Sequence, residues 1–127
     1  MHQIRLILLL LILLNSFSII SFAQTKIPPK SEIRNTAKLA VKYLDSEKFE
    51  KSLETARLSL NYATIIKDDY LIAASYNIIA ANFDALSEYG KAIFFYKKGL
   101  AYANKTNNDT IKNYLNNNLG NVYCFEK

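Results

Sequence analysis

Residues 76–100, with the sequence YNIIAANFDALSEYGKAIFFYKKGL, carry the pattern that decides the fold of this chain. Ala80 and Ala92 are small residues among large ones, so each position has room for a side chain from a facing helix. The turn-forming pair Ser87 and Glu88 lies between them. The stretch therefore predicts two antiparallel helices joined by a short turn. Its bulky apolar residues are Tyr76, Ile79, Phe83, Tyr89, Tyr96 and Leu100.

The same arrangement recurs forty residues away in both directions, as a test for internal repeats shows. Large–small pairs and aromatic residues return at this offset, which indicates a repeated helical hairpin. The repeats extend over about 33–69 and 70–109, with a partial third unit at 110–127. The matching sets are Leu39-Ala40, Ile79-Ala80 and Leu119-Gly120; Tyr43, Phe83 and Tyr123; Phe49 and Tyr89; and Leu60 and Leu100.

Helix-start signals divide the chain into five predicted helices. After a linker at 24–30 containing two prolines, Ser31 is the expected cap of the first helix. Asp68 or Asp69 is expected to cap the third helix, and Asn108 or Asp109 the last. The expected helices begin near Ser31, Lys48, Tyr70, Tyr89 and Thr110.

The first 23 residues have the pattern of a secretory signal peptide. A short basic lead ending at Arg5 precedes an unbroken Leu/Ile run over 6–14, and small residues stand at Ser21 and Ala23. Cleavage after Ala23 is the preferred prediction, which places the protein outside the cytoplasmic membrane, in the periplasm or secreted. An uncleaved membrane anchor is the alternative.

Composition narrows the possible chemistry. The chain has 127 residues and a net charge of +5, which becomes +4 when the leader with Arg5 is removed. Lysines alternate with glutamates along the helices, as on a solvated surface, so nucleic acid is not expected as a partner. His2 leaves with the leader, and Cys124 is the single cysteine. Imidazole catalysis and an internal disulfide are therefore not expected.

The repeat resembles the tetratricopeptide repeat (TPR) family, in its long form of about forty residues. The middle unit carries the family's landmarks most completely, while the first and third units match less well. The residues that carry the resemblance, and that it implies to pack between helices, are Leu39, Ala40, Tyr43, Phe49, Tyr76, Ile79, Ala80, Phe83, Tyr89, Ala92, Tyr96, Leu119, Gly120 and Tyr123. The closing proline of the family is absent, with Thr64 and Asn104 in its place.

This resemblance implies an all-α protein in which antiparallel hairpins stack as a right-handed solenoid over residues 31–127, with the third repeat incomplete. A helical hairpin has two faces and covers only one by itself, so units need neighbours. We therefore expect either further repeats or domains beyond Lys127, or another cover for the apolar side of Leu115, Leu119, Val122 and Tyr123. The first of these is the preferred interpretation.

Candidate binding residues follow from the register of the first helix of each unit. Asn77 and Asn117 occupy the same place in successive units, and Asn121 lies one turn beyond Asn117. Amides both donate to and accept from a peptide backbone. Arg34 begins a basic stripe that meets either an acidic partner or lipid headgroups. The alternatives are scattered amides of an Asn-rich chain and an ordinary solvated face.

No catalytic, cofactor-binding or metal-binding constellation is recognised. Gly90, Gly99 and Gly120 form no phosphate-binding loop. Asp84 and Glu88 lie one turn apart, but a solvated helix end explains them better than an acid/base pair. The sequence thus predicts a non-enzymatic scaffold that binds a protein or peptide partner. The alternative is the extracytoplasmic sensing region of a longer signalling protein, either a sensor kinase or a transcriptional regulator.

Overall fold

The computed structural model describes residues 4, 7 and 26–125. The expected leader and the first part of the linker lie outside this described part, apart from residues 4 and 7. Residues 26–125 form five α-helices and no strand, which confirms the all-helical prediction. The helices are α2 (Lys30–Asp45), α3 (Phe49–Ile65), α4 (Asp69–Ala85), α5 (Tyr89–Ala103) and α6 (Asp109–Phe125).

Three turns of the same geometry connect α2 to α5. In each turn one residue has a positive φ: 57° at Glu47, 55° at Lys67 and 59° at Ser87. The residue after it donates its N–H back to the last turn of the preceding helix, as Lys48 does to the carbonyl of Tyr43 at 2.9 Å. This is the Schellman arrangement of a helix end. The helices α3, α4, α5 and α6 begin at intervals of twenty residues; before α6 a shorter helix and a longer connection replace the common turn.

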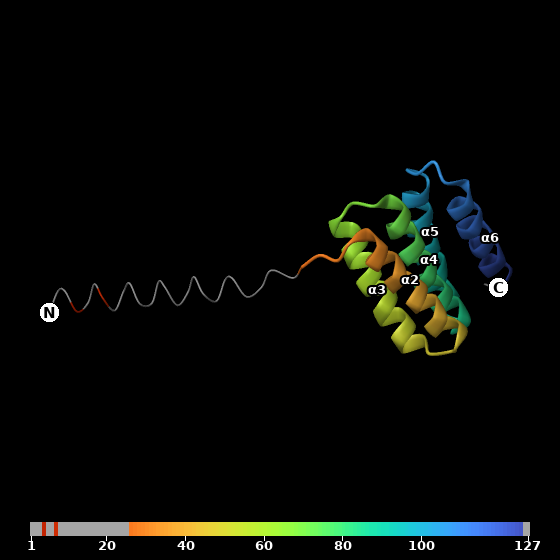
Figure 1. The fold of residues 1–127 in the computed structure, drawn as a ribbon. Coiled ribbons are helices and arrows are strands. Elements are labelled where there is room, and N and C mark those ends of the chain that lie inside the picture. Colours follow the sequence, from red (N-terminus) through yellow and green to blue (C-terminus); the bar gives the residue numbers. More distant parts are fainter. Residues whose placement is uncertain (1–3, 5–6, 8–25, 126–127) are drawn as a thin grey trace.

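The helices form two layers (Figure 1). In one layer α2 contacts α4 and α4 contacts α6, so the first helices of the units touch one another. The other layer holds α3, which packs on α2 and α4, and α5, which packs on α4 and α6. There is no contact between α3 and α5 themselves. The helices of the layer α2, α4 and α6 therefore lie closer to one another than α3 and α5 do.

A row of aromatic rings joins α4 to α5. Tyr76 lies between Tyr102 and Phe95, with ring centroids 5.9 and 6.2 Å away, and Phe95 stacks on Phe83 at 5.5 Å. Offset stacking of this kind adds about 0.5–1.5 kcal/mol per pair to the burial of apolar area. Tyr96, which is 1% exposed, completes the α5 side of the core. The middle hairpin is thus the most aromatic part of the interior.

The interface between α3 and α4 contains buried polar contacts. Ser52 Oγ donates to the carbonyl of Ala40 at 2.8 Å and accepts from Asn82 Nδ2 at 2.8 Å. Farther along, the hydroxyls of Ser59 and Ser75 lie 2.9 Å apart. Each of these four side chains is fully buried. Asn82 Oδ1 has no hydrogen-bond partner among the described residues.

Most residues of the repeat pattern lie in or beside the core, but three do not. Leu39 and Tyr123 are each 42% exposed, and Gly120 faces open space. Leu39 is the counterpart of Ile79, which lies on the side of α4 that bonds to α3 through Ser75 and Asn82. In α2 the corresponding side is exposed at Leu39. Gly120 and Tyr123 lie on the side of α6 where α4 has α5. The pattern marks these positions as packed, but among the described helices none covers them as Ile79, Ala80 and Phe83 are covered in α4. The fully or largely buried members are Ala40, Ile79, Ala80, Phe83, Ala92 and Tyr96, and the half-buried ones are Tyr43, Phe49, Tyr76, Tyr89 and Leu119.

The expectation that the apolar side of α6 needs an outside cover is wrong for its central residues. Leu115 and Val122 are fully buried, and Leu119 is half-buried, because α6 packs against α5 and α4. The sequence treats these residues as one side together with Tyr123. A helix has 3.6 residues per turn, so Leu115 and Val122 share the buried face of α6. Tyr123 lies at the edge of that face, 42% exposed, with the ammonium of Lys97 of α5 5.6 Å from the centre of its ring.

The first helix starts one residue earlier than expected, and its cap differs. Pro29 is the N-cap of α2 and its carbonyl accepts from the N–H of Ile33 at 3.1 Å. Ser31 lies within the first turn and makes no capping bond. At α4 and α6 the side chains of Asp68 and Asn108 are the caps, which confirms one member of each expected pair.

The glycines of α5 and α6 provide a test of this packing. A Cβ at Gly99 would lie 2.9 Å from Leu115 Cδ2 and 3.3 Å from the carbonyl oxygen of Ala73. Gly99→Ala should therefore lower the free energy of unfolding, by about 1–2 kcal/mol after the gain in helix propensity. Gly120→Ala meets nothing within 4 Å. It should raise stability by up to about 1 kcal/mol. Urea unfolding followed by circular dichroism measures both, and equal effects of the two changes would contradict the packing.

Candidate functional site

A groove of about 240 Å³ runs along the layer formed by α2, α4 and α6. Its floor is apolar, because Ala37, Leu71 and Ile78 are buried beneath it. Its walls are more polar, with Arg34 and Lys38 on α2 and Asn77 on α4. The full lining is Arg34, Ala37, Lys38, Val41, Tyr70, Leu71, Ala74, Asn77, Ile78 and Ile111.

The α2 wall of the groove is cationic. Arg34 and Lys38 lie one helical turn apart and are both exposed. Near them Asp68 caps α4, accepting from the Leu71 N–H at 2.9 Å, and pairs with the ammonium of Lys30. Burial acts to raise the pKa of the Asp68 carboxyl, but its bonds to Lys30 and Leu71 and the charges of Lys30 and Arg34 outweigh burial and lower the pKa. The local charge thus favours an anionic group in the groove.

Asn77, on the α4 side of the groove, is hydrogen-bonded to an amide of α6 outside the lining. Asn118 Nδ2 of α6 donates to Asn77 Oδ1 of α4 at 2.9 Å, and both side chains are half-buried. This bond holds the two helices in register where the groove continues from α4 to α6. Asn118 was not singled out in the sequence, since it lies in a run of three asparagines that periodicity alone does not separate.

Of the four residues expected to bind a partner, two therefore line the groove and two do not. Arg34 and Asn77 line the groove. Asn117 and Asn121 are exposed on α6 and do not line it. Sequence reasoning missed the apolar contributors, Val41 and Tyr70 among them, because a partly exposed apolar residue and a core residue give the same helical pattern.

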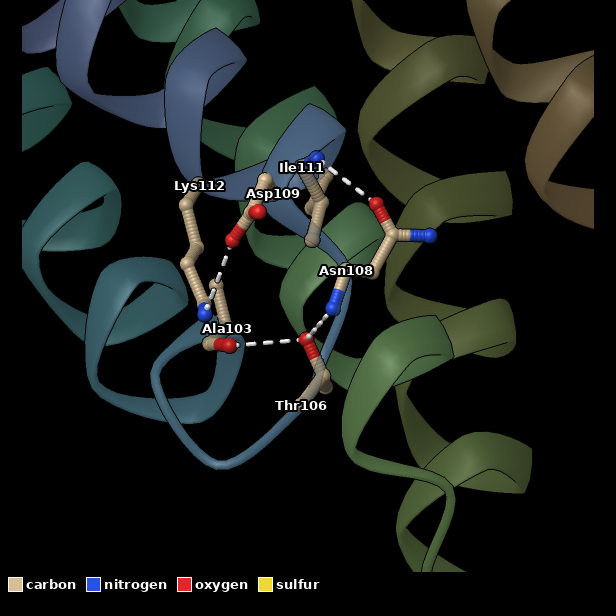
Figure 2. A network of polar contacts seen from close by, with 6 residues as sticks. All are labelled: Ala103, Thr106, Asn108, Asp109, Ile111 and Lys112. Atoms are coloured by element: carbon tan, nitrogen blue, oxygen red, sulfur yellow. Dashed lines mark hydrogen bonds and ion pairs between the residues drawn. The ribbon is translucent and has the colours of Figure 1, made fainter.

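Ile111 reaches the groove floor because the turn before α6 is closed by polar contacts (Figure 2). Thr106 Oγ1 donates to the carbonyl of Ala103 at 2.8 Å and accepts from the Asn108 N–H at 3.2 Å. The side chain of Asn108 then accepts from the Ile111 N–H at 3.1 Å. The cap fixes where α6 begins, and the first turn of the helix carries Ile111 against α4.

Candidate catalytic and metal groups are sparse in the part of the chain that the structure describes. No group of three His, Cys, Asp or Glu side chains there is placed to hold a metal ion. Burial raises the pKa of Asp84, while Glu88 pairs with the ammonium of Lys91. Cys124 is exposed, and its thiol lies 3.5 Å from the carbonyl of Gly120. A larger pocket lies at the α2–α3 turn and shares no residue with the groove.

Comparison of the chain with protein-family models, with curated proteins and with solved structures found no match. In the described residues, no helix has the length and apolar character needed to cross a membrane.

The Asp68 ion pair gives stability that depends on pH. Its pKa is lowered in the folded chain, so the contribution is complete above the unfolded value of 3.8 and is lost as the pH falls through the folded pKa. Asp68→Asn keeps a capping side chain but loses the charge. At pH 7 it should cost up to about 1 kcal/mol of unfolding free energy, and the difference should vanish in strong acid.

The matched control for this change is Asp69→Asn, at the first residue of α4. Urea titrations at pH 7 and below pH 3 compare the two variants. A deficit in Asp68→Asn that persists at the lower pH would show that the ion pair is not its cause.

Proposed function

We propose that this chain is a helical-repeat scaffold of the tetratricopeptide type that binds an extended segment of a protein partner in the groove of α2, α4 and α6. The observation that supports this proposal most directly is the chemistry of the groove, with its apolar floor, its cationic α2 wall and the amide of Asn77 on α4. An extended peptide offers matching groups, since it has apolar side chains on one side and a backbone that exchanges hydrogen bonds with amides.

The layering of the helices supports a curved array. In a stack of hairpins, the layer whose helices touch lies on the inside of the curve. Here α2, α4 and α6 touch, while α3 and α5 remain apart. The groove then lies on the concave side, where several units reach one ligand together. The right-handed solenoid and the third, incomplete repeat belong to this proposal, as do further repeats or domains beyond Lys127.

Arg34 and Lys38 indicate the kind of peptide. Two exposed cations one turn apart on the wall of an apolar groove favour a segment that carries an acidic side chain beside apolar ones. The expected mechanism is non-covalent recognition by shape and charge, with no catalytic step and no cofactor.

Peptides selected from a displayed random library on the immobilised chain should be enriched in Asp or Glu next to apolar residues. With such a peptide, fluorescence anisotropy should show that Arg34→Glu combined with Lys38→Glu weakens binding by at least about tenfold, because opposite charges become like charges. The control is Arg57→Glu on α3 combined with Lys105→Glu after α5, two exposed positions outside both the groove and the α2–α3 turn, which makes the same change of net charge elsewhere. If both pairs weaken binding equally, the groove is not the site.

Export is the second part of the proposal. It is supported by the basic lead, the Leu/Ile run and the small residues before Gln24, which together have the pattern of a signal peptide. N-terminal sequencing of the protein recovered from outside the cytoplasm of an expressing bacterium should read from Gln24. A sequence that begins at Met1 on membrane-bound protein would instead support the uncleaved anchor.

A further inference from the structure

A second pocket lies at the corner formed by the α2–α3 and α4–α5 turns. It measures about 550 Å³. Its apolar lining comes from Phe49 and Leu53 of α3 and from Leu86, whose side chain is 42% exposed. Its rim carries two acids and two bases, Glu47, Lys48, Glu50 and Lys51. This pocket shares no lining residue with the proposed groove.

The residue equivalent to Phe49, forty residues further on, is stacked with an aromatic ring. Tyr89 holds the position of Phe49, and the ring of Phe125 stacks on Tyr89 with centroids 6.1 Å apart and planes 23° apart. Phe125 is the last residue of α6. Its counterpart at the end of α4 is Ala85, which has only a methyl group. No described aromatic ring stacks on Phe49, so the ring pair formed at Tyr89 has no equivalent at Phe49.

We propose that this pocket binds an aromatic side chain of a partner peptide, which stacks on Phe49 as Phe125 stacks on Tyr89. The stacking of Phe125 on Tyr89 indicates the chemistry of the ligand, a phenyl-type ring placed over the aromatic residue that begins the helix. Leu53 and Leu86 then contact the edges of the ring. The mixed charges of the rim pair with the polar backbone and flanking residues of a peptide, whereas Glu47 and Glu50 disfavour an anionic lipid surface.

This inference is independent of the proposed groove, because the two sites share no residue and face different ligand groups. Failure of one therefore leaves the other intact. A partner that uses both would place an acidic, extended segment along α2 and an aromatic anchor at the α2–α3 turn.

The test is a titration of the ¹⁵N-labelled chain with the capped tripeptide acetyl-Gly-Phe-Gly-amide, followed by NMR. Saturable shifts are expected at residues 47–53 and 86, with the capped Gly-Ala-Gly peptide causing none. Ala85 is the counterpart of Phe125, so Ala85→Phe places a ring over Phe49 and should fill the pocket with a side chain of the protein itself. Its affinity for the Phe peptide should fall at least about tenfold.

Two further variants make the result decisive. Ala101→Phe adds the same ring at an exposed position of α5 outside the pocket and should leave binding unchanged. Leu86→Glu puts a charge into the lining without adding a ring and should weaken binding, which keeps the test valid if Ala85→Phe misfolds. Absence of saturable shifts, shifts at Arg34 and Asn77 instead, or equal loss in Ala101→Phe would each overturn the proposal. Shifts that depend on protein concentration without peptide would overturn it in favour of a second copy of this chain as the occupant.

Discussion

The structure depends on one repeated constraint, the way each helix from α2 to α4 ends. Glu47, Lys67 and Ser87 take up the left-handed backbone conformation that stops a helix and turns the chain back. A residue with a Cβ is strained there, at a cost of about 1 kcal/mol or more. The turns nevertheless keep the same hydrogen bonds, since the packed helices on both sides hold them. Each of these turns reverses the chain within three residues, so consecutive helices from α2 to α5 pack against one another.

The two equivalent interfaces of the array are filled in different ways. Between α3 and α4, Ser59 meets Ser75 through a hydrogen bond. Forty residues on, between α5 and α6, the same two positions hold Gly99 and Leu115, and the larger leucine occupies the space that the glycine leaves. Replacing one residue of a pair by its equivalent from the other pair would leave a void or cause a clash. The interfaces are thus not interchangeable, although the backbone repeat is the same, and this difference favours a single order of stacking.

Both proposed sites arise from departures from the repeat. The groove is cationic because Arg34 and Lys38 have as counterparts Ala74 and Ile78 in the next unit, which form its apolar floor. The pocket at Phe49 is open because the end of α4 is a small residue where the end of α6 is aromatic. The repeated residues build the scaffold, and the residues that differ between the units give each surface its own chemistry.

The sequence by itself determined the helices, their approximate limits and the forty-residue unit, because helical periodicity and large–small alternation are local properties of the chain. Burial at the ends of the array was decided by the tertiary structure. Leu39 and Tyr123 carry the same pattern as buried Ile79 and Phe83, but α4 packs against α2, α3, α5 and α6, while α2 packs only against α3 and α4, and α6 only against α4 and α5, among the described helices. The tertiary structure also decided that Asn77 pairs with Asn118 and not with Asn117, the residue at the equivalent position of the repeat. Which amide of a run points to the neighbouring helix depends on the placement of that helix, and no spacing along one chain segment contains this information.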